Sequence, residues 1–315
     1  MTPSDPLILA ADIGGTNTRL ALFDGARMRA GSTASYRNKG VRHLNAHLER
    51  YLSEHSAQPD LLTLALAGPV QGQTGQLTNL KWKIIADESG AVCGAQRAVL
   101  LNDLQAQGHA LAHVDPSHVT MLHGAAVPDV GQTKLVINLG TGLNVAAVYT
   151  LPDGSVFVPP AEAGHITFSP QDPSLASVGE VMLGNMDHLA QEDVLSGRGM
   201  SNIYTALTDR SCTPQDIIDM RRANDPDAVR AISLMARALG AYAGDMALVH
   251  LARGGVYLVG GAARALVPYL TPADFEAAYL NKGRFSDVTR AIPVQVVEDD
   301  FAALNGAVHY ALQSV

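Results

Sequence analysis

The chain has 315 residues, of which 47% are hydrophobic and 17% are charged. This composition can bury a sizeable core and excludes an intrinsically disordered chain, which combines low hydrophobicity with high net charge. The chain holds 22 basic and 30 acidic residues, a net charge of -8 at pH 7. This acidic balance argues against nucleic acid as the main partner, because phosphate backbones are bound by basic surfaces.

The cysteines and the most apolar stretch indicate a cytoplasmic protein. Cys93 and Cys212 are far apart in the sequence and cannot build a disulfide framework or a Cys-rich zinc site. The N-terminal residues lack the basic stretch of a signal peptide. Residues 231–252 are apolar but include Arg237 and Asp245, so a buried helix explains them better than a membrane span. We therefore expect a soluble protein without a membrane partner.

The first hundred residues predict a mixed α/β domain. Residues 7–11 form an apolar run typical of a buried strand, and the alternation over 18–23 predicts a second strand. The glycine-rich turn at 12–17 therefore joins strand to strand, whereas the glycines of a Rossmann unit or a P-loop open a helix. The elements that follow are a helix at 44–52 and apolar strands at 61–67 and 98–101.

A second strand–turn–strand pattern indicates an internal duplication. Residues 135–138 and 144–149 predict strands, and a turn at 139–142 joins them. The segment Asn138-Leu139-Gly140-Thr141-Gly142 repeats the order of Asp12-Ile13-Gly14-Gly15-Thr16: a carboxylate or its amide, an aliphatic residue, then a small Gly/Thr loop. The two segments are too far apart for a solenoid repeat, so the repeated unit is a domain.

The last third of the chain is more helical. Asp225-Pro226 is a helix start signal, and Gly254-Gly255 marks the end of a long buried helix. A strand at 256–259 breaks at Gly260-Gly261, and a short helix at 301–312 closes the chain. The predicted apolar stripe of the long helix consists of Val229, Ile232, Met235, Leu239, Tyr242, Met246 and Val249.

The two Gly/Thr turns are candidates for binding polyphosphate. Glycine lets backbone N–H groups approach phosphate oxygens closely, and the hydroxyls of Thr16 and Thr141 could add hydrogen bonds. Either turn alone could equally be an ordinary tight hairpin turn. Two such turns in a duplicated pattern favour a pair of loops that hold the phosphates of a nucleotide from both sides. Asp12, beside the first turn, could hold the water shell of a phosphate-bridging Mg²⁺; the alternative is an Asx-turn residue.

Polar residues at other strand and loop ends could serve catalysis and sugar binding. Asp103 follows a buried strand and is the right type for a general base, or else caps the helix that begins at Leu104. Glu162, His165 and Glu192 supply groups that pair with sugar hydroxyls, which both donate and accept. The alternatives are a structural histidine and a solvated surface carboxylate, and no third ligand supports a zinc site.

Taken together, these motifs resemble the bacterial ATP-dependent glucokinases of the hexokinase, actin-like superfamily, nearly from end to end. One departure is Asn144, which stands where the family usually has glycine after the second Gly/Thr turn. The segments that carry the resemblance are, in chain order, Ala11–Leu22, Ala67–Val70, Thr78–Trp82, Asn102-Asp103, Gly140–Leu143, Glu162–His165, Glu192–Gly197, Gly254–Gly261 and Lys282–Phe285.

The resemblance assigns roles to residues at these positions. It implies Asp103 as the catalytic base. The implied glucose ligands are Asn102, Glu162, His165 and Glu192. The implied ATP-binding residues are Asp12, Gly14, Gly15, Thr16, Asn17, Gly140, Thr141, Gly142, Gly260 and Gly261. Mg²⁺ comes with ATP and has no direct protein ligand, although Asp12 can reach it through water.

The resemblance also implies a fold and a reaction. The fold is an actin-like (ribonuclease-H-like) duplicated α/β fold, with a small domain of residues 1–107 plus 298–315, a large α+β domain of residues 108–297, a cleft between them and, commonly, a homodimer. The reaction is phosphoryl transfer from ATP to the 6-hydroxyl of glucose, which gives glucose 6-phosphate and ADP as the first step of glycolysis.

Three rival hypotheses remain at this stage. The first is a kinase for another hexose or an amino sugar, since sequence does not fix which epimer fits. The second is a sugar-sensing transcriptional regulator on the same fold, which would need a DNA-binding extension before the first strand, where only six residues stand. The third is a catalytically silent sugar-binding protein, against which the carboxylate of Asp103 counts.

Overall fold

The structure is a computed structural model that describes residues 5–77, 80–124, 131–170, 172–184 and 186–314. The chain divides into two compact units, which we describe separately: one runs to Val114 and resumes at Asp299, and the other is Asp115–Glu298. Thr78 and Asn79 of the family motif, and residues 1–4, on which the expectation about a signal peptide rests, lie outside the described residues.

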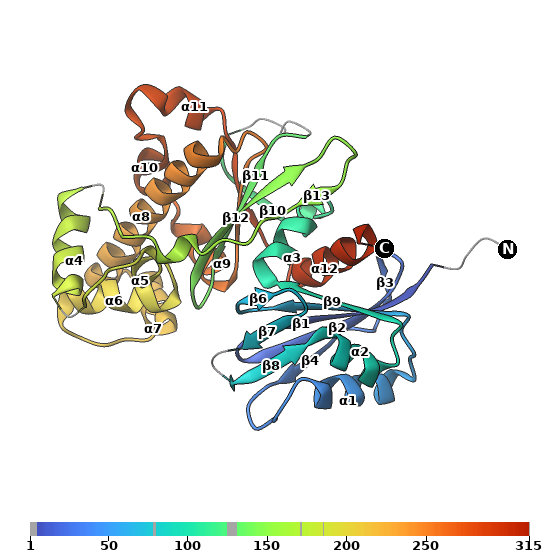
Figure 1. The fold of residues 1–315 in the computed structure, drawn as a ribbon. Helices are drawn as coiled ribbons and strands as arrows, with labels where there is room; N and C mark the ends of the chain where they lie inside the picture. Colours follow the sequence, from blue (N-terminus) through green and yellow to red (C-terminus); the bar gives the residue numbers. More distant parts are fainter. Residues whose placement is uncertain (1–4, 78–79, 125–130, 171, 185, 315) are drawn as a thin grey trace. The chain divides into compact units, whose positions relative to one another are not determined.

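The first unit is built on a mixed six-stranded sheet in the order β3-β2-β1-β5-β9, with β4 paired to β2 (Figure 1). Strands β1 and β2 are antiparallel, whereas β5 and β9 run parallel to β1. The strands are β1 (Leu7–Ile13), β2 (Asn17–Asp24), β3 (Arg27–Met28), β4 (Ala34–Arg37), β5 (Leu61–Leu66) and β9 (Arg97–Asn102).

Helices cover both faces of this sheet, which explains why its central strands are apolar throughout. Alternate residues of β1 point to opposite faces of the sheet: Leu9 packs with α1 and α2, and Ile8 packs with α12. Figure 1 shows α1 and α2 on one side of this sheet and α12 on the other. Helix α3 packs beside α12 over Ala65 and Leu101. The helices of this unit are α1 (Asn45–His55), α2 (Ala86–Cys93), α3 (Asp103–Ala110) and α12 (Ala302–Gln313).

A small antiparallel sheet lies between β5 and α2 in the sequence. It consists of β6 (Val70–Gln71), β7 (Thr74–Leu77) and β8 (Trp82–Ile85). The ring of Trp82 is only 3% exposed, and its Nε1–H donates to the carbonyl of Val41 at 3.3 Å. The tryptophan of the family motif is therefore a core residue that anchors this sheet.

The second unit repeats the sheet order of the first, which confirms the predicted duplication. Its sheet has the order β10-β15-β14-β11-β12-β13, in which β11 and β12 are antiparallel and β14 and β15 run parallel to β11. Thus β12-β11-β14-β15 matches β2-β1-β5-β9 in order and in direction. The strands are β10 (Val119–His123), β11 (Lys134–Leu139), β12 (Leu143–Thr150), β13 (Val156–Phe157), β14 (Val256–Val259) and β15 (Val294–Val297).

The helices of the second unit pack mostly around one long helix, α8, with the apolar side chains of β11, β14 and β15 (Figure 1). They are α4 (Pro173–Leu183), α5 (Gln191–Val194), α6 (Gly197–Thr208), α7 (Pro214–Arg222), α8 (Pro226–His250), α9 (Gly261–Leu266), α10 (Ala277–Leu280) and α11 (Ser286–Arg290). Shorter 3-10 or π turns span Pro116–His118, Ala163–His165, Val267–Tyr269, Pro272–Glu276 and Gly283–Phe285.

Helix α8 begins where the sequence predicts, and the predicted apolar stripe is buried or half-buried except at Val249. The carboxylate of Asp225 accepts from the amides of Asp227 and Ala228 and caps the helix. Val249 is 68% exposed, and Ala247 is fully buried. Residues two positions apart in a helix, such as Ala247 and Val249, lie about 200° apart around its axis. The last turn of α8 therefore buries the side opposite Val249.

Helix α8 is also the one described helix that is long and apolar enough to cross a membrane, but 72% of its most apolar window is buried inside the protein. That degree of burial is typical of a core helix.

Other predicted elements agree with the structure, with differences at their ends. Strand β1 continues through Asp12 and Ile13, so these residues belong to the ladder and not to the turn. Helix α3 runs through Gln107, where the sequence suggests a domain boundary, and ends at Ala110. Both elements are longer because their pairing or packing partners continue beyond the local pattern.

A buried histidine and a half-buried one make the stability of the first unit depend on pH. The ring of His109 is 4% exposed and meets Tyr310 edge-on, and its Nδ1 has no hydrogen-bond partner among the described residues. Burial, helped by His309, lowers the pKa of His109 to about 4. Burial and the stacked ring of His113 likewise lower the pKa of His309 to about 4.

We predict that the free energy of unfolding falls as pH drops from about 6.5 to about 4. In this window the histidine binds a proton in the unfolded chain but not in the folded chain. For His109 the free energy of unfolding therefore falls by about 1.4 kcal/mol per pH unit. Denaturant titrations between pH 7.5 and 5 measure the slope. His109→Phe should reduce it, with the same change at exposed His43 as the control; an equal slope in His109→Phe and the native chain would contradict the prediction.

Candidate active site

The first glycine turn keeps its shape through one buried side chain. The amide of Gly14 donates to the carbonyl of Asn17 at 3.0 Å, and Ile13 and Thr18 form the last pair of the ladder. Asn38 is fully buried: its Nδ2 donates to the carbonyl of Gly14 at 2.8 Å, and its Oδ1 accepts from the hydroxyl of Thr18 at 2.8 Å. At the tip of the turn, Gly15 is half-buried and Thr16 is exposed.

Sequence reasoning missed Asn38, because no local pattern marks it. Its role depends on the pairing of β4 with β2, which places Arg37 opposite Asn17 and brings the next residue against the turn. The amide of Asn38 also donates to the carbonyl of Thr16 at 2.9 Å. Only the strand order could have revealed this contact.

Asp12 lies beside the first turn and is paired across the ladder. It stands opposite Arg19, whose Nη1 is 3.3 Å from Asp12 Oδ2. Burial raises the pKa of the Asp12 carboxyl, and the Arg19 guanidinium opposes this shift. Because the Asp12 side chain pairs with Arg19 across the two strands, we favour this ion pair over the Asx-turn interpretation. The carboxylate is thus held at the end of β1, next to the open tip.

The second glycine turn is supported by Glu192. The amide of Gly140 donates to the carbonyl of Gly142 at 2.9 Å, and Leu143 N–H donates to Glu192 Oε2 at 3.0 Å. A Cβ added to Gly142 would stand 2.5 Å from the same oxygen, so a side chain here would displace the Glu192 carboxylate from this contact. The turn is also fixed from its other side, because the amide of Gly197 donates to the carbonyl of Gly140 at 2.8 Å.

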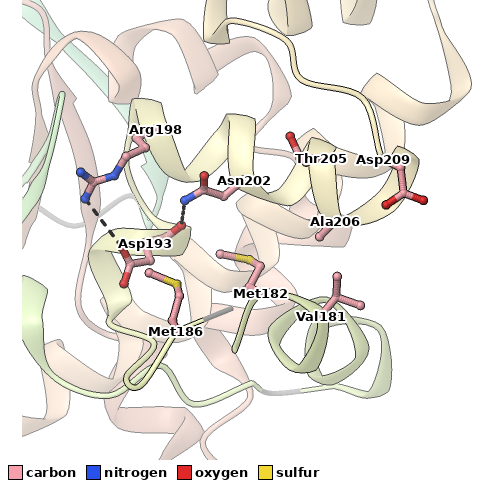
Figure 2. Close-up of a pocket in the computed structure, with 9 residues that line it drawn as sticks. All are labelled: Val181, Met182, Met186, Asp193, Arg198, Asn202, Thr205, Ala206 and Asp209. Carbon is pink, nitrogen blue, oxygen red and sulfur yellow. Dashed lines mark hydrogen bonds and ion pairs between the residues drawn. The ribbon is translucent and has the colours of Figure 1, made fainter. Parts of the chain in front are cut away.

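Glu192 is not a solvated surface carboxylate, since its side chain is only 20% exposed. Arg198 Nη2 donates to its Oε1 at 3.0 Å and lies 3.6 Å from Asp193 Oδ1. Figure 2 shows Arg198 reaching toward Asp193, and the amide of Asn202 bonded to the Asp193 carbonyl at 2.9 Å. Both oxygens of Glu192 therefore have fixed partners, one on the second turn and one on α6.

A cavity of about 720 Å³ opens beside the second turn. Gly140 and Thr141 of the turn line it, and its lining is largely apolar, as suits a flat ring system. Gly260, with φ +99°, turns the chain from β14 into α9, and a Cβ there would stand 2.5 Å from the carbonyl of Leu139. The remaining lining residues are Gly197, Arg198, Met200, Thr213, Pro214, Gln215, Ile218, Gly261, Ala262 and Ala265.

The predicted nucleotide residues of the second unit therefore converge: Gly140, Thr141 and Gly261 line one cavity, and Gly142 and Gly260 adjoin these residues in the chain. The other predicted nucleotide residues, Asp12 to Asn17, belong to the first unit.

At the end of β9, Asn102 rather than Asp103 caps the following helix. Asn102 Oδ1 accepts from Leu104 N–H at 2.9 Å, and the Gln105 side chain accepts from Asn102 N–H at 3.2 Å, which completes a capping box. Asn102 Nδ2 donates to the carbonyl of Gly68 at 3.0 Å. Asp103 is then the first residue of α3, half-buried, with Oδ1 accepting from Leu104 N–H at 2.9 Å.

The remaining sugar candidates, Glu162 and His165, are exposed and lie on a segment packed against the start of β12. A Cβ at Gly164 would stand only 1.9 Å from the carbonyl of Leu143, so the segment touches the strand directly. Leu143 thus contacts both sugar-candidate segments, the one with Glu162 and His165 through its carbonyl and the one with Glu192 through its N–H. The structure brings these three candidates to one end of the second unit.

The described residues contain no group of three or more His, Cys, Asp or Glu side chains placed to hold a metal ion.

A repeated sheet with a glycine turn in each copy is the actin-like (ribonuclease-H-like) fold of sugar kinases. Comparison with known proteins narrows the class. A family model described as Glucokinase matches residues 9–314, and the glucokinase of Mesorhizobium japonicum is 33% identical over 96% of this chain and 91% of its own length. The chain belongs to the glucokinase family.

Solved structures agree with this assignment. A glucokinase from an Antarctic psychrotroph superposes with a TM-score of 0.87 at 26% identity, covering 99% of both chains. A ROK family glucokinase from Streptomyces griseus, in complex with glucose and AMPPNP, shares the fold with a TM-score of 0.61 at 18% identity, covering 98% of this chain and 99% of that one.

We predict that Asn38→Ala weakens both the first unit and its glycine turn. The change leaves the buried Thr18 hydroxyl without its acceptor and releases the Gly14 carbonyl. Leaving such groups unpaired costs about 1–3 kcal/mol each, so the free energy of unfolding should fall by that order. Denaturant titration measures the loss, and the KM for ATP should rise with it. A variant with native stability and an unchanged KM for ATP would show that Asn38 does not support the turn.

Proposed function

We propose that this chain transfers the γ-phosphoryl group of ATP to the 6-hydroxyl of glucose, giving glucose 6-phosphate and ADP. The observation that carries the proposal lies within the second unit. There a cavity is lined by Gly140 and Thr141 of a Gly/Thr turn, and the residue after that turn, Leu143, contacts both segments that bear the sugar candidates. Membership of the glucokinase family supports the same reaction.

The cavity beside the second turn would take the nucleotide base, with the phosphates along Gly140–Gly142. Backbone N–H groups in such turns bind anions, and here the turn is already fixed before any ligand arrives. Gly14–Asn17 would hold the phosphates from the first unit. Mg²⁺ enters as part of the Mg·ATP substrate, and the Asp12 carboxylate would contact its water shell.

Glucose would be recognised by Glu162, His165 and Glu192 from the second unit and by Asn102 from the first. The Asn102 side chain already caps α3 and binds the Gly68 carbonyl, so its sugar contact would have to share these groups. Carboxylate oxygens accept from sugar hydroxyls, and imidazole can donate or accept. A dense set of such groups favours one hydroxyl pattern over its epimers, because a mismatched hydroxyl leaves partners unpaired.

Asp103 would act as the general base. As the 6-hydroxyl oxygen bonds to the γ-phosphorus, the carboxylate accepts the hydroxyl proton, and the bond from phosphorus to the bridging oxygen of ADP breaks. The fold presents this carboxylate at the first position of α3, because Asn102 takes the capping role.

Three further properties complete the proposal. We place the enzyme in the cytoplasm, in agreement with its reduced cysteines, and expect the homodimer that the resemblance implies. Its net charge of -8 supports a small-molecule substrate rather than nucleic acid.

A coupled ADP-release assay over a panel of hexoses and amino sugars tests the function. Glucose should give the highest kcat/KM, and no ADP should accumulate without sugar. A higher kcat/KM for another hexose or an amino sugar would replace glucose as the substrate. Binding of glucose without ADP release would favour the silent sugar-binding protein.

In the same assay, we predict that Asp103→Asn lowers kcat by roughly 10²–10⁴-fold, the range typical of losing a general base. The amide keeps an acceptor for Leu104 N–H, so calorimetry should still detect glucose binding. Asp115→Asn, at the start of a different helical turn, is the matched control. Near-normal turnover of Asp103→Asn would refute the assignment of the base.

For the sugar ligands, we predict that Glu162→Gln and His165→Asn raise the KM for glucose more than the KM for ATP. Each unpaired contact costs about 1–3 kcal/mol, which corresponds to roughly 5- to 150-fold. Glu192→Gln should raise both constants, because Glu192 also supports the second glycine turn. If all three variants kept a native KM for glucose, the sugar site would lie elsewhere.

A further inference from the structure

Asn144, the residue that departs from the family pattern, is tied to the segment that carries Glu162. It is the second residue of β12, opposite Asn138 in the ladder. Its side-chain oxygen accepts from the backbone amides of Val145 at 2.8 Å and of Ala163 at 3.0 Å. The oxygen therefore fixes the backbone immediately after Glu162.

The amide nitrogen of the same side chain fixes the other side. Asn144 Nδ2 donates to the carbonyl of Ala161 at 2.6 Å and lies 3.4 Å from Glu162 Oε2. Glu162 is thus held through both its chain neighbours and through its own carboxylate. Glycine at this position could make none of these contacts, since it has no side chain.

Glu162 needs such support more than the other carboxylate of the site. It is exposed, and its side chain does not cap the 3-10 turn that follows it. Glu192, by contrast, has each oxygen fixed by a separate partner. An exposed glutamate samples many rotamers, and ordering it on binding costs conformational entropy. The contacts of Asn144 remove part of that freedom before a sugar arrives.

We propose that Asn144 is a positioning residue that sets Glu162 to accept a hydrogen bond from a sugar hydroxyl. The Nδ2–H donor orients the carboxylate through Oε2, and the acceptor sites of the two oxygens that it does not use can receive the hydroxyl. The inference rests on the proposed function, because it is there that Glu162 contacts sugar. It assigns to Asn144 the pre-organisation of one ligand of the glucose site.

Steady-state kinetics of Asn144→Gly give the first test. The variant should raise the KM for glucose by about 3- to 10-fold, with the KM for ATP and kcat changed by less than about twofold, as expected when one hydrogen-bonded support is lost. The control is Asn224→Gly, the same change at an exposed turn with φ +59°. An unchanged KM for glucose in an active Asn144→Gly enzyme would overturn the inference.

Asn144→Asp tests the donor side of this residue. The introduced carboxyl keeps an oxygen for the amides of Val145 and Ala163. When ionised, it loses the donor to the Ala161 carbonyl and repels Glu162. The KM for glucose should therefore rise further than in Asn144→Gly and recover, relative to the native enzyme, as pH falls from 8 to 5.5. At low pH a proton shared between the two carboxyls restores a donor to Glu162. A defect that does not change with pH would contradict positioning through Glu162.

A double-mutant cycle and hydrogen exchange complete the test. In a Glu162→Gln background, Asn144→Gly should add little to the KM for glucose, whereas fully multiplicative effects would mean that Asn144 acts elsewhere. Without any ligand, Asn144→Gly should also speed amide exchange over residues 161–165 several-fold; unchanged exchange would overturn the inference even in an active enzyme. If the native enzyme itself did not phosphorylate glucose, the proposed function would be overturned instead. The two failures are therefore distinguishable.

Discussion

Both glycine turns depend on a polar side chain from elsewhere in their own unit. A turn that binds phosphate must leave backbone N–H groups bare, and bare backbone has few hydrogen bonds of its own to hold it. Asn38 fixes the first turn through Gly14 and Thr18, and Glu192 fixes the second through Leu143. The supporting bonds go to the flanks of each turn, which leaves the tips open to a ligand.

The duplicated topology explains where these supports come from. Asn38 lies in the connection that follows β2, and Glu192 lies in the connection that follows β12, the matching strand of the second sheet. In the first unit that connection runs from Gly25 to Asp60 and includes β3, β4 and α1. In the second it is long and also carries Glu162 and His165. Under the proposed function, the same scaffold would serve phosphate binding in both copies and sugar recognition chiefly in one.

Much of the fold follows from local sequence patterns, whereas the site does so only in part. Apolar runs and glycine turns predict the strands and the duplication because these patterns reflect local burial and backbone freedom. Asn38 and the Arg19 partner of Asp12 require strand pairing, which no local pattern contains. Val249 looked buried because its spacing fits an apolar stripe, but what packs against the last turn of α8 decides its exposure.

The positions of functional residues could be predicted more readily than their contacts. The resemblance marks Asn102 and Asp103 as a pair, but only the geometry separates a helix cap from the carboxylate that follows it. In the same way, Asn144 stands out in the sequence as a departure from glycine, whereas its bonds to Ala161 and Ala163 depend on a segment that packs against β12 from further along the chain.

The central claim is that the chain moves a phosphoryl group from ATP to one defined oxygen of glucose. Phosphorus NMR of a mixture of the enzyme, Mg·ATP and glucose tests it most directly, because the coupling of phosphorus to sugar protons identifies the carbon that bears the phosphate. The account predicts one new phosphomonoester signal coupled to the two protons of carbon 6, matched by an equal amount of ADP. Phosphate on another carbon, or ADP accompanied only by inorganic phosphate, would contradict it.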